Sequence, residues 1–113
     1  MNSAILKTLT LSLILYFSAF ATITAQTRKE VDLTKATNEF KALRYVSAIE
    51  ELAPIVKADT TNVRAQEMIA YSYKMIKNYI EALYWYEKLT RQSNAKPEWF
   101  LYYAESLANN QQY

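Results

Sequence analysis

From about residue 33 onward, the aromatic and aliphatic residues follow a helical spacing, with polar residues between them. The pattern predicts helices over residues 33–43, 46–57, 63–76 and 79–91, and a fifth helix that begins at Pro97. Proline suits the first position of a helix, and Glu98 then lies at the positive end of the helix dipole. We therefore expect a mainly helical chain with negligible strand.

Polar residues and one proline modify these expected helices. Asp32 or Thr34 is a candidate cap for the first helix. Ser47 and Glu50 have the spacing of a capping box near the start of the second. Pro54 falls inside that helix, where it removes one backbone hydrogen bond, so we expect a kink or a shorter helix.

Turns are predicted where cap and turn residues gather. Residues 59–62, Asp-Thr-Thr-Asn, separate the second and third helices. Asn78 and the pair Asn109-Asn110 are expected at tight turns between paired helices. The chain has no glycine, and asparagine is the next most tolerant of left-handed backbone geometry.

The same residue types recur 34 positions apart. The recurring series are Tyr45, Tyr79 and Tyr113; Ala36, Ala70 and Ala104; and Ala48 and Ala82. A fixed period of this length is typical of stacked helix–turn–helix units. Such an array presents an extended surface to partners, so the period favours binding over catalysis.

Residues 70–89, AYSYKMIKNYIEALYWYEKL, resemble the core stretch of the tetratricopeptide (TPR) family. The resemblance implies an all-α, TPR-type helix–turn–helix solenoid of about two and a half repeats within residues 31–113. The first repeat, about 31–60, departs from the family at Glu39, where the family prefers an aromatic residue. The third begins near Pro97 and has one helix. The alternative is a generic helical bundle with accidental spacing.

Composition limits the chemistry that the chain can perform. There is no histidine and no cysteine, so Ser-His-Asp triads, Cys-His dyads and the usual zinc sites are excluded. The net charge is +2 and no basic run occurs, so we expect no nucleic-acid partner. We expect no enzymatic activity, cofactor, metal or small-molecule substrate. The remaining enzymatic alternative is a helical wall-cleaving enzyme that uses a single glutamate, Glu39 or Glu67.

Residues 1–25 have the three-part layout of a secretory signal. One positive charge, Lys7, precedes an apolar stretch over residues 9–20, and Ile23, Thr24 and Ala25 form a small-residue ending. We therefore expect residues 1–25 to be a signal peptide and residues 26–113 to be the mature domain. The alternative is a retained membrane anchor, although the apolar stretch is shorter than the roughly 20 residues that span a bilayer.

In the TPR family the first helix of each repeat lines a concave groove. Carried over by position, the resemblance implies that a protein or peptide partner contacts the faces of three helices in this chain. The implied groove residues are Phe40, Lys41, Arg64, Glu67, Tyr71, Lys74, Met75, Glu98, Leu101 and Glu105, with Leu33, Thr37 and Asn109 beside them. This mixed surface suits an extended peptide or a neighbouring domain.

The last helix is expected to expose Tyr103, Ala104 and Leu107, because the helix that should cover them does not follow. We expect either self-association through this face or a longer protein of which the chain is the N-terminal part. The segments EALYWYEKL and KPEWFLYYAESLANNQQY, with the Ala-Gln signal ending, resemble the N-terminal TPR segment of OmpA-like envelope proteins of gliding, type IX-secreting bacteria. This resemblance implies an exported protein, periplasmic or associated with the outer membrane, that docks envelope proteins. A membrane-anchored TPR adaptor is the alternative.

Overall fold

A computed structural model describes residues 30–111, and within that range the chain is all-helical with no strand. The helices are α2 (Thr34–Lys41), α3 (Tyr45–Ala58), α4 (Val63–Met75), α5 (Tyr79–Thr90) and α6 (Pro97–Gln111). The all-helical prediction is confirmed for this part of the chain, and the expected helices agree closely with the observed ones at both ends. The predicted signal peptide or anchor, and the tyrosine at position 113, lie outside the described residues.

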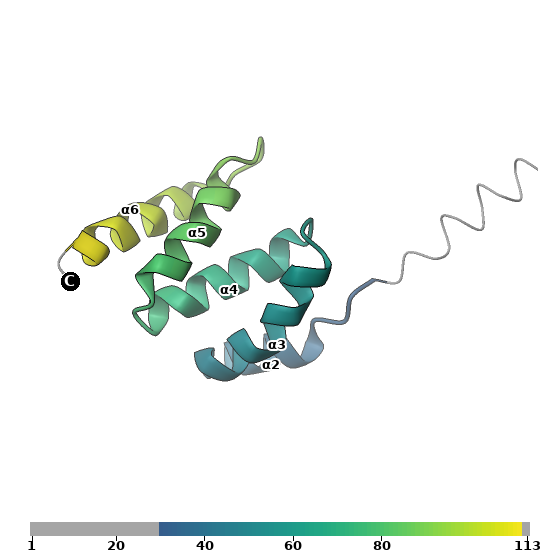
Figure 1. Cartoon of the computed structure of the whole chain (residues 1–113). Helices are drawn as coiled ribbons and strands as arrows, with labels where there is room; N and C mark the ends of the chain where they lie inside the picture. The colour runs from purple at the N-terminus through teal and green to yellow at the C-terminus, as the bar shows by residue number, and fades with distance from the viewer. Residues whose placement is uncertain (1–29, 112–113) are drawn as a thin grey trace, which may run out of the picture. The chain divides into compact units, whose positions relative to one another are not determined.

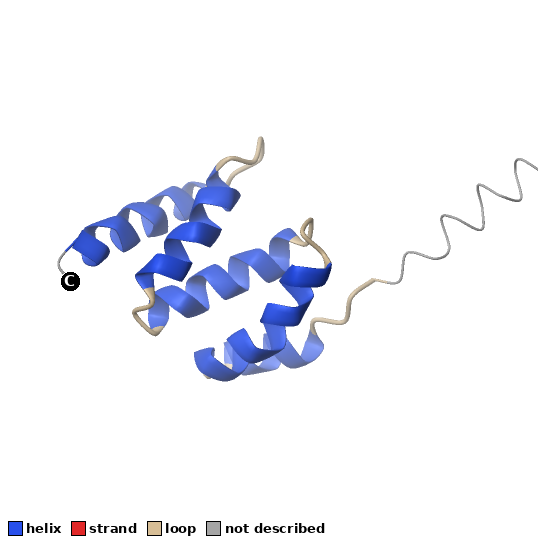
Figure 2. Ribbon diagram, in the orientation of Figure 1, coloured by secondary structure: helices blue, strands red, loops and turns tan. Residues whose placement is uncertain are grey.

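The five helices alternate in direction, and each packs on the next along the chain (Figure 1). In addition α2 contacts α4, and α4 contacts α6, so these three helices form one layer and α3 and α5 form the other. Figure 2 shows the loops in two groups: the α2–α3 and α4–α5 turns lie on one edge, and the α3–α4 and α5–α6 loops lie on the opposite edge. The molecule therefore has two distinct edges and one face built from alternate helices.

Buried alanines lie where the helices meet. Ala36, Ala48, Ala70 and Ala82 are each at most 1% exposed, whereas Ala104, in the same series, is exposed. Larger side chains fill the space between the helices in two clusters. The first contains Leu52, Val56, Met68 and Ile69, and the second contains Tyr86, Leu89 and Trp99.

Asparagines cap the helices α4 and α5. The Asn62 side chain accepts a hydrogen bond from the Ala65 N–H at 3.1 Å, and the Asn78 side chain accepts one from the Glu81 N–H at 3.3 Å. Each cap satisfies one of the backbone donors that a helix leaves free in its first turn. Asn78 therefore lies at the predicted turn, and its role there is that of an N-cap.

Left-handed backbone geometry falls on other residues. Leu43 and Lys77 have φ of 61° and 62°, and they occupy the equivalent turns of the two hairpins, one repeat apart. For a residue with a Cβ atom this conformation costs roughly 1–2 kcal/mol. At Lys77 the turn places Asn78 at the cap of α5, which offsets part of that cost, whereas Arg44 after Leu43 makes no capping bond.

Two further predictions about helix ends are wrong, and a third is wrong in part. The cap position of α3 is Arg44, which makes no capping hydrogen bond, so Ser47 and Glu50 do not form a capping box. Of the two effects expected at Pro54, the shortening does not occur, because α3 continues to Ala58, and the kink stays a prediction. The asparagine pair at 109–110 lies within α6 and not in a turn.

Neither candidate cap of the first helix, Asp32 or Thr34, occupies the cap position, but Asp32 binds a backbone donor there. Its carboxylate accepts a hydrogen bond from the Thr34 N–H at 2.9 Å, immediately before α2 begins. The Thr34 side chain, and to a smaller extent this backbone hydrogen bond, lower the pKa of Asp32. The residue at the cap position itself is Leu33, which makes no side-chain capping bond.

The outer face of α6 is partly apolar. Phe100 is 52% and Leu107 39% exposed, and Ala104 lies between them. The prediction for Tyr103 is wrong, because its ring is half-buried against the second cluster. The exposed stripe therefore consists of Phe100, Ala104 and Leu107, spaced along one side of the helix.

We expect this stripe to drive weak self-association. Replacing Phe100 and Leu107 by glutamate should lower the apparent molecular mass in light scattering at high protein concentration, because burying apolar area favours association. The matched control is Leu101→Glu, since Leu101 is 56% exposed on another side of the same helix. If the wild-type chain scatters as a monomer at all concentrations, the stripe has no such role.

Candidate functional site

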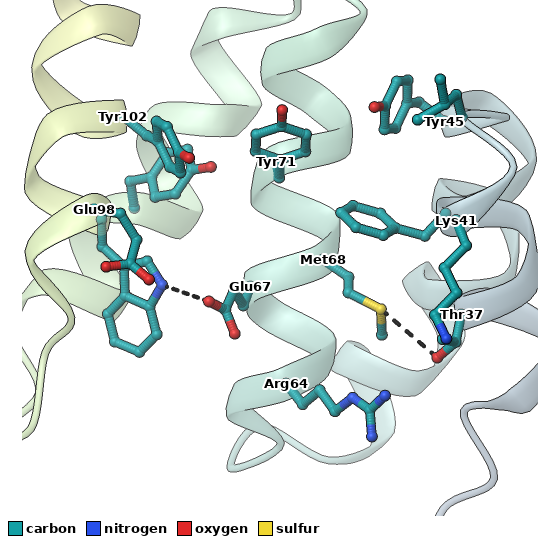
Figure 3. A pocket seen from close by; sticks show the side chains of 13 residues that line it. Thr37, Lys41, Tyr45, Arg64, Glu67, Met68, Tyr71, Glu98 and Tyr102 are labelled. Carbon is teal, nitrogen blue, oxygen red and sulfur yellow. Dashed lines mark hydrogen bonds between the residues drawn. The ribbon is translucent and has the colours of Figure 1, made fainter.

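A pocket of about 570 Å³ lies on the face formed by α2, α4 and α6 (Figure 3). Aromatic residues are the largest group in its lining, with charged residues around them. The lining residues are Thr37, Phe40, Lys41, Leu43, Tyr45, Arg64, Glu67, Met68, Tyr71, Tyr86, Glu98, Trp99 and Tyr102. Six of the ten predicted groove residues line this pocket, namely Phe40, Lys41, Arg64, Glu67, Tyr71 and Glu98.

Aromatic rings run across the pocket from α2 to α6. The Tyr71 ring packs edge-on against Phe40, with centroids 5.7 Å apart, and against Tyr102, with centroids 5.5 Å apart. Tyr45 closes a triangle with Phe40 and Tyr71, at centroid distances of 5.9 and 6.0 Å. Edge-to-face pairs of this kind contribute about 0.5–1.5 kcal/mol each beyond area burial. The rings hold one another in place and form a preorganised apolar surface.

Glu67 ties α4 to the start of α6. Its carboxylate accepts a hydrogen bond from Trp99 Nε1 at 3.0 Å and pairs with Lys96 Nζ at 3.0 Å. Lys96 Nζ also lies 5.5 Å from the centroid of the Trp99 indole. Trp99 itself is 2% exposed, so this contact fixes the floor of the pocket between the two helices.

Lys74 and Glu105 join α4 to α6 farther along the same face. Lys74 Nζ lies 2.7 Å from a Glu105 carboxylate oxygen and 4.7 Å from the Tyr102 ring centroid. Both residues were predicted for the groove, and the structure places them beside the pocket and paired with each other. Met75 and Leu101, also predicted, are exposed and do not line the pocket.

Three charged side chains of the lining have no opposite charge within salt-bridge distance in residues 30–111. They are Lys41 and Arg64, on the α2–α4 side, and Glu98, on α6. Figure 3 shows the two cations on the side of the pocket opposite Glu98. The pocket therefore offers positive charge at one side, negative charge at the other and aromatic rings between them.

The Tyr86 hydroxyl is buried at this pocket. Tyr86 is 1% exposed, lines the pocket, and its hydroxyl has no hydrogen-bond partner among the described residues. Burial raises the pKa of Tyr86 well above its ordinary value, with smaller contributions from Tyr102 and Tyr71. A buried hydroxyl without a partner costs about 1–3 kcal/mol, and an acceptor that reached it would remove that cost.

We expect Tyr86→Phe to stabilise the unliganded protein at neutral pH by about 1 kcal/mol, because it removes an unsatisfied hydroxyl and keeps the ring. The folded state holds the Tyr86 proton to higher pH than the unfolded chain. The stability that depends on this proton is therefore present below about pH 10 and is lost as the pH rises further. Thermal melts from pH 7 to pH 11 should show a shallower alkaline decline for the variant. A variant less stable than wild type at pH 7 would mean that the hydroxyl already has a partner.

Several lining residues escaped the sequence analysis. They are Leu43, Tyr45, Met68, Tyr86, Trp99 and Tyr102. The repeat period carries a signal for one of them, because Tyr102 occupies the position of Met68 one repeat later, and both line the pocket. Trp99 occupies the position of Ala65 one repeat later. Because Ala65 does not line the pocket, the repeat period does not predict that Trp99 does.

Within residues 30–111, no group of acidic side chains is arranged to hold a metal ion, and no helix there has the length and apolar character needed to cross a bilayer. Comparison of the chain with protein-family models, curated proteins and solved structures gives no match. The pocket and its surroundings are therefore the features of the chain that bear on its function.

Proposed function

We propose that the chain is a protein-interaction module that binds an extended peptide segment across α2, α4 and α6. The observation that carries this proposal is the aromatic pocket on that face, bordered by unpaired charges and floored by the buried Tyr86 hydroxyl. Binding pockets are commonly apolar and preformed, with a few polar groups that fix orientation. The rings that hold Tyr71 between Phe40 and Tyr102 support such preorganisation.

We further propose that the module is of the TPR type. Two features support this assignment: the period of the sequence, and the alternation of helices that builds one face from α2, α4 and α6. Alanines at equivalent positions, such as Ala36 and Ala70, are almost fully buried, as close helix crossings require. Groove binding in this type of array uses the first helix of each pair, and these are the helices that line the pocket.

The charges indicate the chemistry of the bound segment. An acidic side chain or a terminal carboxylate would meet Lys41 and Arg64, and a basic side chain would meet Glu98. An apolar or aromatic side chain between them would lie over Tyr71. Each exposed charge pair contributes little by itself, so the apolar side chain carries most of the affinity and the charges set the direction of the segment.

We propose binding and not catalysis at this site. The two glutamates of the enzymatic alternative are already engaged: Glu39 is held by Arg44 through hydrogen bonds of 2.6 and 3.0 Å, and Glu67 by Trp99 and Lys96. The hydrogen bonds from Arg44 lower the pKa of Glu39. A general acid for glycoside hydrolysis needs the opposite shift, so a wall-cleaving mechanism has little support.

The envelope assignment is also a proposal. We propose an exported module, periplasmic or bound at the outer membrane, that forms the N-terminal part of an OmpA-like protein. Its support is the resemblance of residues 1–25 to a secretory signal and of the repeats to that family. N-terminal sequencing of the exported protein tests it: a start at Gln26 supports export with cleavage, and a retained start at Met1 favours the membrane-anchored adaptor.

Peptide selection tests the groove. Peptides selected from a random displayed library on the wild-type chain should carry an acidic residue and an aromatic or large aliphatic one. Titration calorimetry should then show a loss of about tenfold or more for Tyr71→Ala, because hot-spot contacts of this kind exceed about 1 kcal/mol. Lys41→Ala with Arg64→Ala should weaken acidic peptides selectively. Lys57→Ala with Arg91→Ala, which removes two exposed cations outside the pocket, is the matched control. Peptides that bind all variants equally would place the site elsewhere.

A further inference from the structure

Exposed large apolar side chains gather at the two hairpin turns. Leu43 and Val46 flank the α2–α3 turn at 69% and 58% exposed. Met75, Ile76 and Ile80 flank the α4–α5 turn at 43%, 40% and 72% exposed. Val46 and Ile80 are each the second residue of their helix, one repeat apart, so both hairpins present an apolar side chain at the same position.

The two loops of the opposite edge differ, and the exposed Phe100 lies only at the fourth residue of α6. The α3–α4 loop, residues 59–62, and the α5–α6 loop, residues 91–96, contain no exposed large hydrophobic side chain. Figure 1 shows both hairpin turns on one edge and both of these loops on the other. The exposed apolar side chains thus differ between the two ends of the same helices. Helix amphipathicity separates one side of a helix from the other, so it does not explain a difference between ends.

Cations accompany the apolar side chains at the hairpin turns. Lys41 and Lys77 lie beside them, and neither forms an ion pair within residues 30–111. The nearby acids are engaged or directed elsewhere. Glu39 pairs with Arg44 at 2.6 Å, and Glu81 lines a separate pocket formed mainly by α3 and α5. Glu81 is exposed and forms no ion pair within residues 30–111, so with the two lysines the free charge at this edge is positive on balance.

We propose that the hairpin-turn edge, formed by Leu43, Val46, Met75, Ile76 and Ile80, docks on an anionic lipid surface. The apolar side chains enter the boundary between headgroups and acyl chains, and the Lys41 and Lys77 ammonium groups lie at the level of the phosphates. Such docking leaves the helices upright on the membrane and the groove face open to a partner. It rests mainly on side chains outside the groove pocket: of the five apolar side chains only Leu43 lines that pocket, and of the two lysines only Lys41.

The shape of this edge favours a lipid surface over a protein partner. A specific protein interface needs a complementary surface, and its anchor side chains fill pockets of the partner. Here the side chains stand on two separate turns, at equivalent positions, with unpaired cations beside them. A fluid bilayer can accommodate such exposed apolar side chains without a complementary shape. Each one adds affinity in proportion to the apolar area it buries, and the cations add attraction to anionic headgroups.

The absence of cysteine in the chain permits a site-specific test. Single cysteines carrying an environment-sensitive nitrobenzoxadiazole dye are placed in the full-length chain. Val46→Cys and Ile80→Cys report on the hairpin-turn edge, and Thr61→Cys and Ser93→Cys report on the opposite edge. Vesicles of phosphatidylethanolamine and phosphatidylglycerol should shift the dye emission to the blue at positions 46 and 80 only. Nitroxide-labelled lipids should quench the same two positions. Residues 1–29 are identical in all four proteins, so any membrane affinity of that segment is common to them.

A second arm separates apolar and electrostatic contributions. Ile80→Asp in the Val46→Cys protein should weaken vesicle binding, measured through the dye emission, by about tenfold. The reason is that a charged side chain replaces an apolar one at the membrane surface. Thr61→Asp in the same background should leave it unchanged. Vesicles of phosphatidylcholine alone should bind several-fold more weakly than anionic ones.

Three results would overturn the proposal. One is equal emission shifts on both edges, and another is no shift at positions 46 and 80. The third is a shift at these positions that grows with protein concentration without vesicles, which would identify a contact between copies of the chain. Loss of peptide binding in Tyr71→Ala bears on the proposed function alone, since Tyr71 lies outside this edge, whereas Lys41→Ala bears on both proposals.

Discussion

Replacing Ala70 by tryptophan should destabilise the domain by about 1–3 kcal/mol or more, whereas the same replacement at Ala104 should change stability by no more than about 0.5 kcal/mol. The two alanines occupy the same position of successive repeats. Ala70 is 0% exposed between α4 and its neighbours, and Ala104 is exposed on the outer side of α6. An indole at Ala70 has no space, so the helices must separate or strained rotamers must form.

Urea unfolding followed by circular dichroism measures the difference. The pair is well matched because the residue type and the repeat position are the same, and the presence of a covering helix differs. Equal shifts of the unfolding midpoint would mean that α6 is also covered on that side in solution. In that event, concentration dependence of the Ala104→Trp midpoint would identify a second copy as the cover.

Much of the fold follows from local sequence. Helix positions are encoded by the spacing of apolar residues, and the start of α6 is encoded by Pro97, whose fixed φ suits a first turn. The stacking is encoded by the period, because small residues recur where helices cross. Tertiary context decides the details that local rules missed. Lys77, not Asn78, takes the left-handed position, because Asn78 gains more as a cap.

The site was less predictable than the fold. The period places residues on the faces of α2, α4 and α6, which accounts for the six predicted residues that line the pocket. It does not tell which side chains meet across helices. Glu67 contacts Lys96 and Trp99, and both contacts span a shorter stretch of chain than one full repeat. The unpartnered hydroxyl of Tyr86 depends on every neighbour around it and has no sequence signal at all.

Trp99→Ala should cost about 3–5 kcal/mol of stability, with the loss concentrated at the junction of α4 and α6. The indole is 2% exposed, packs in the second core cluster, and donates its N–H to Glu67 at 3.0 Å. Truncation leaves a cavity and removes one of the two partners of that carboxylate. Because α6 has only α5 and α4 as neighbours among the described helices, we expect it to open before the rest of the domain.

Two further variants divide this loss into its parts. Trp99→Phe keeps most of the apolar volume but loses the indole donor, and Glu67→Gln keeps a side-chain acceptor while removing the charge that pairs with Lys96. We expect Trp99→Phe to cost about 1–3 kcal/mol, less than Trp99→Ala, and Glu67→Gln about 1 kcal/mol or less, since Lys96 is exposed. Amide hydrogen exchange should show faster exchange in α6 for Trp99→Ala, while α3 and the first core cluster remain protected. Uniform loss of protection across all five described helices would show instead that the domain unfolds as one cooperative unit. Trp99 would then stabilise the whole core and would not specifically hold α6 in place.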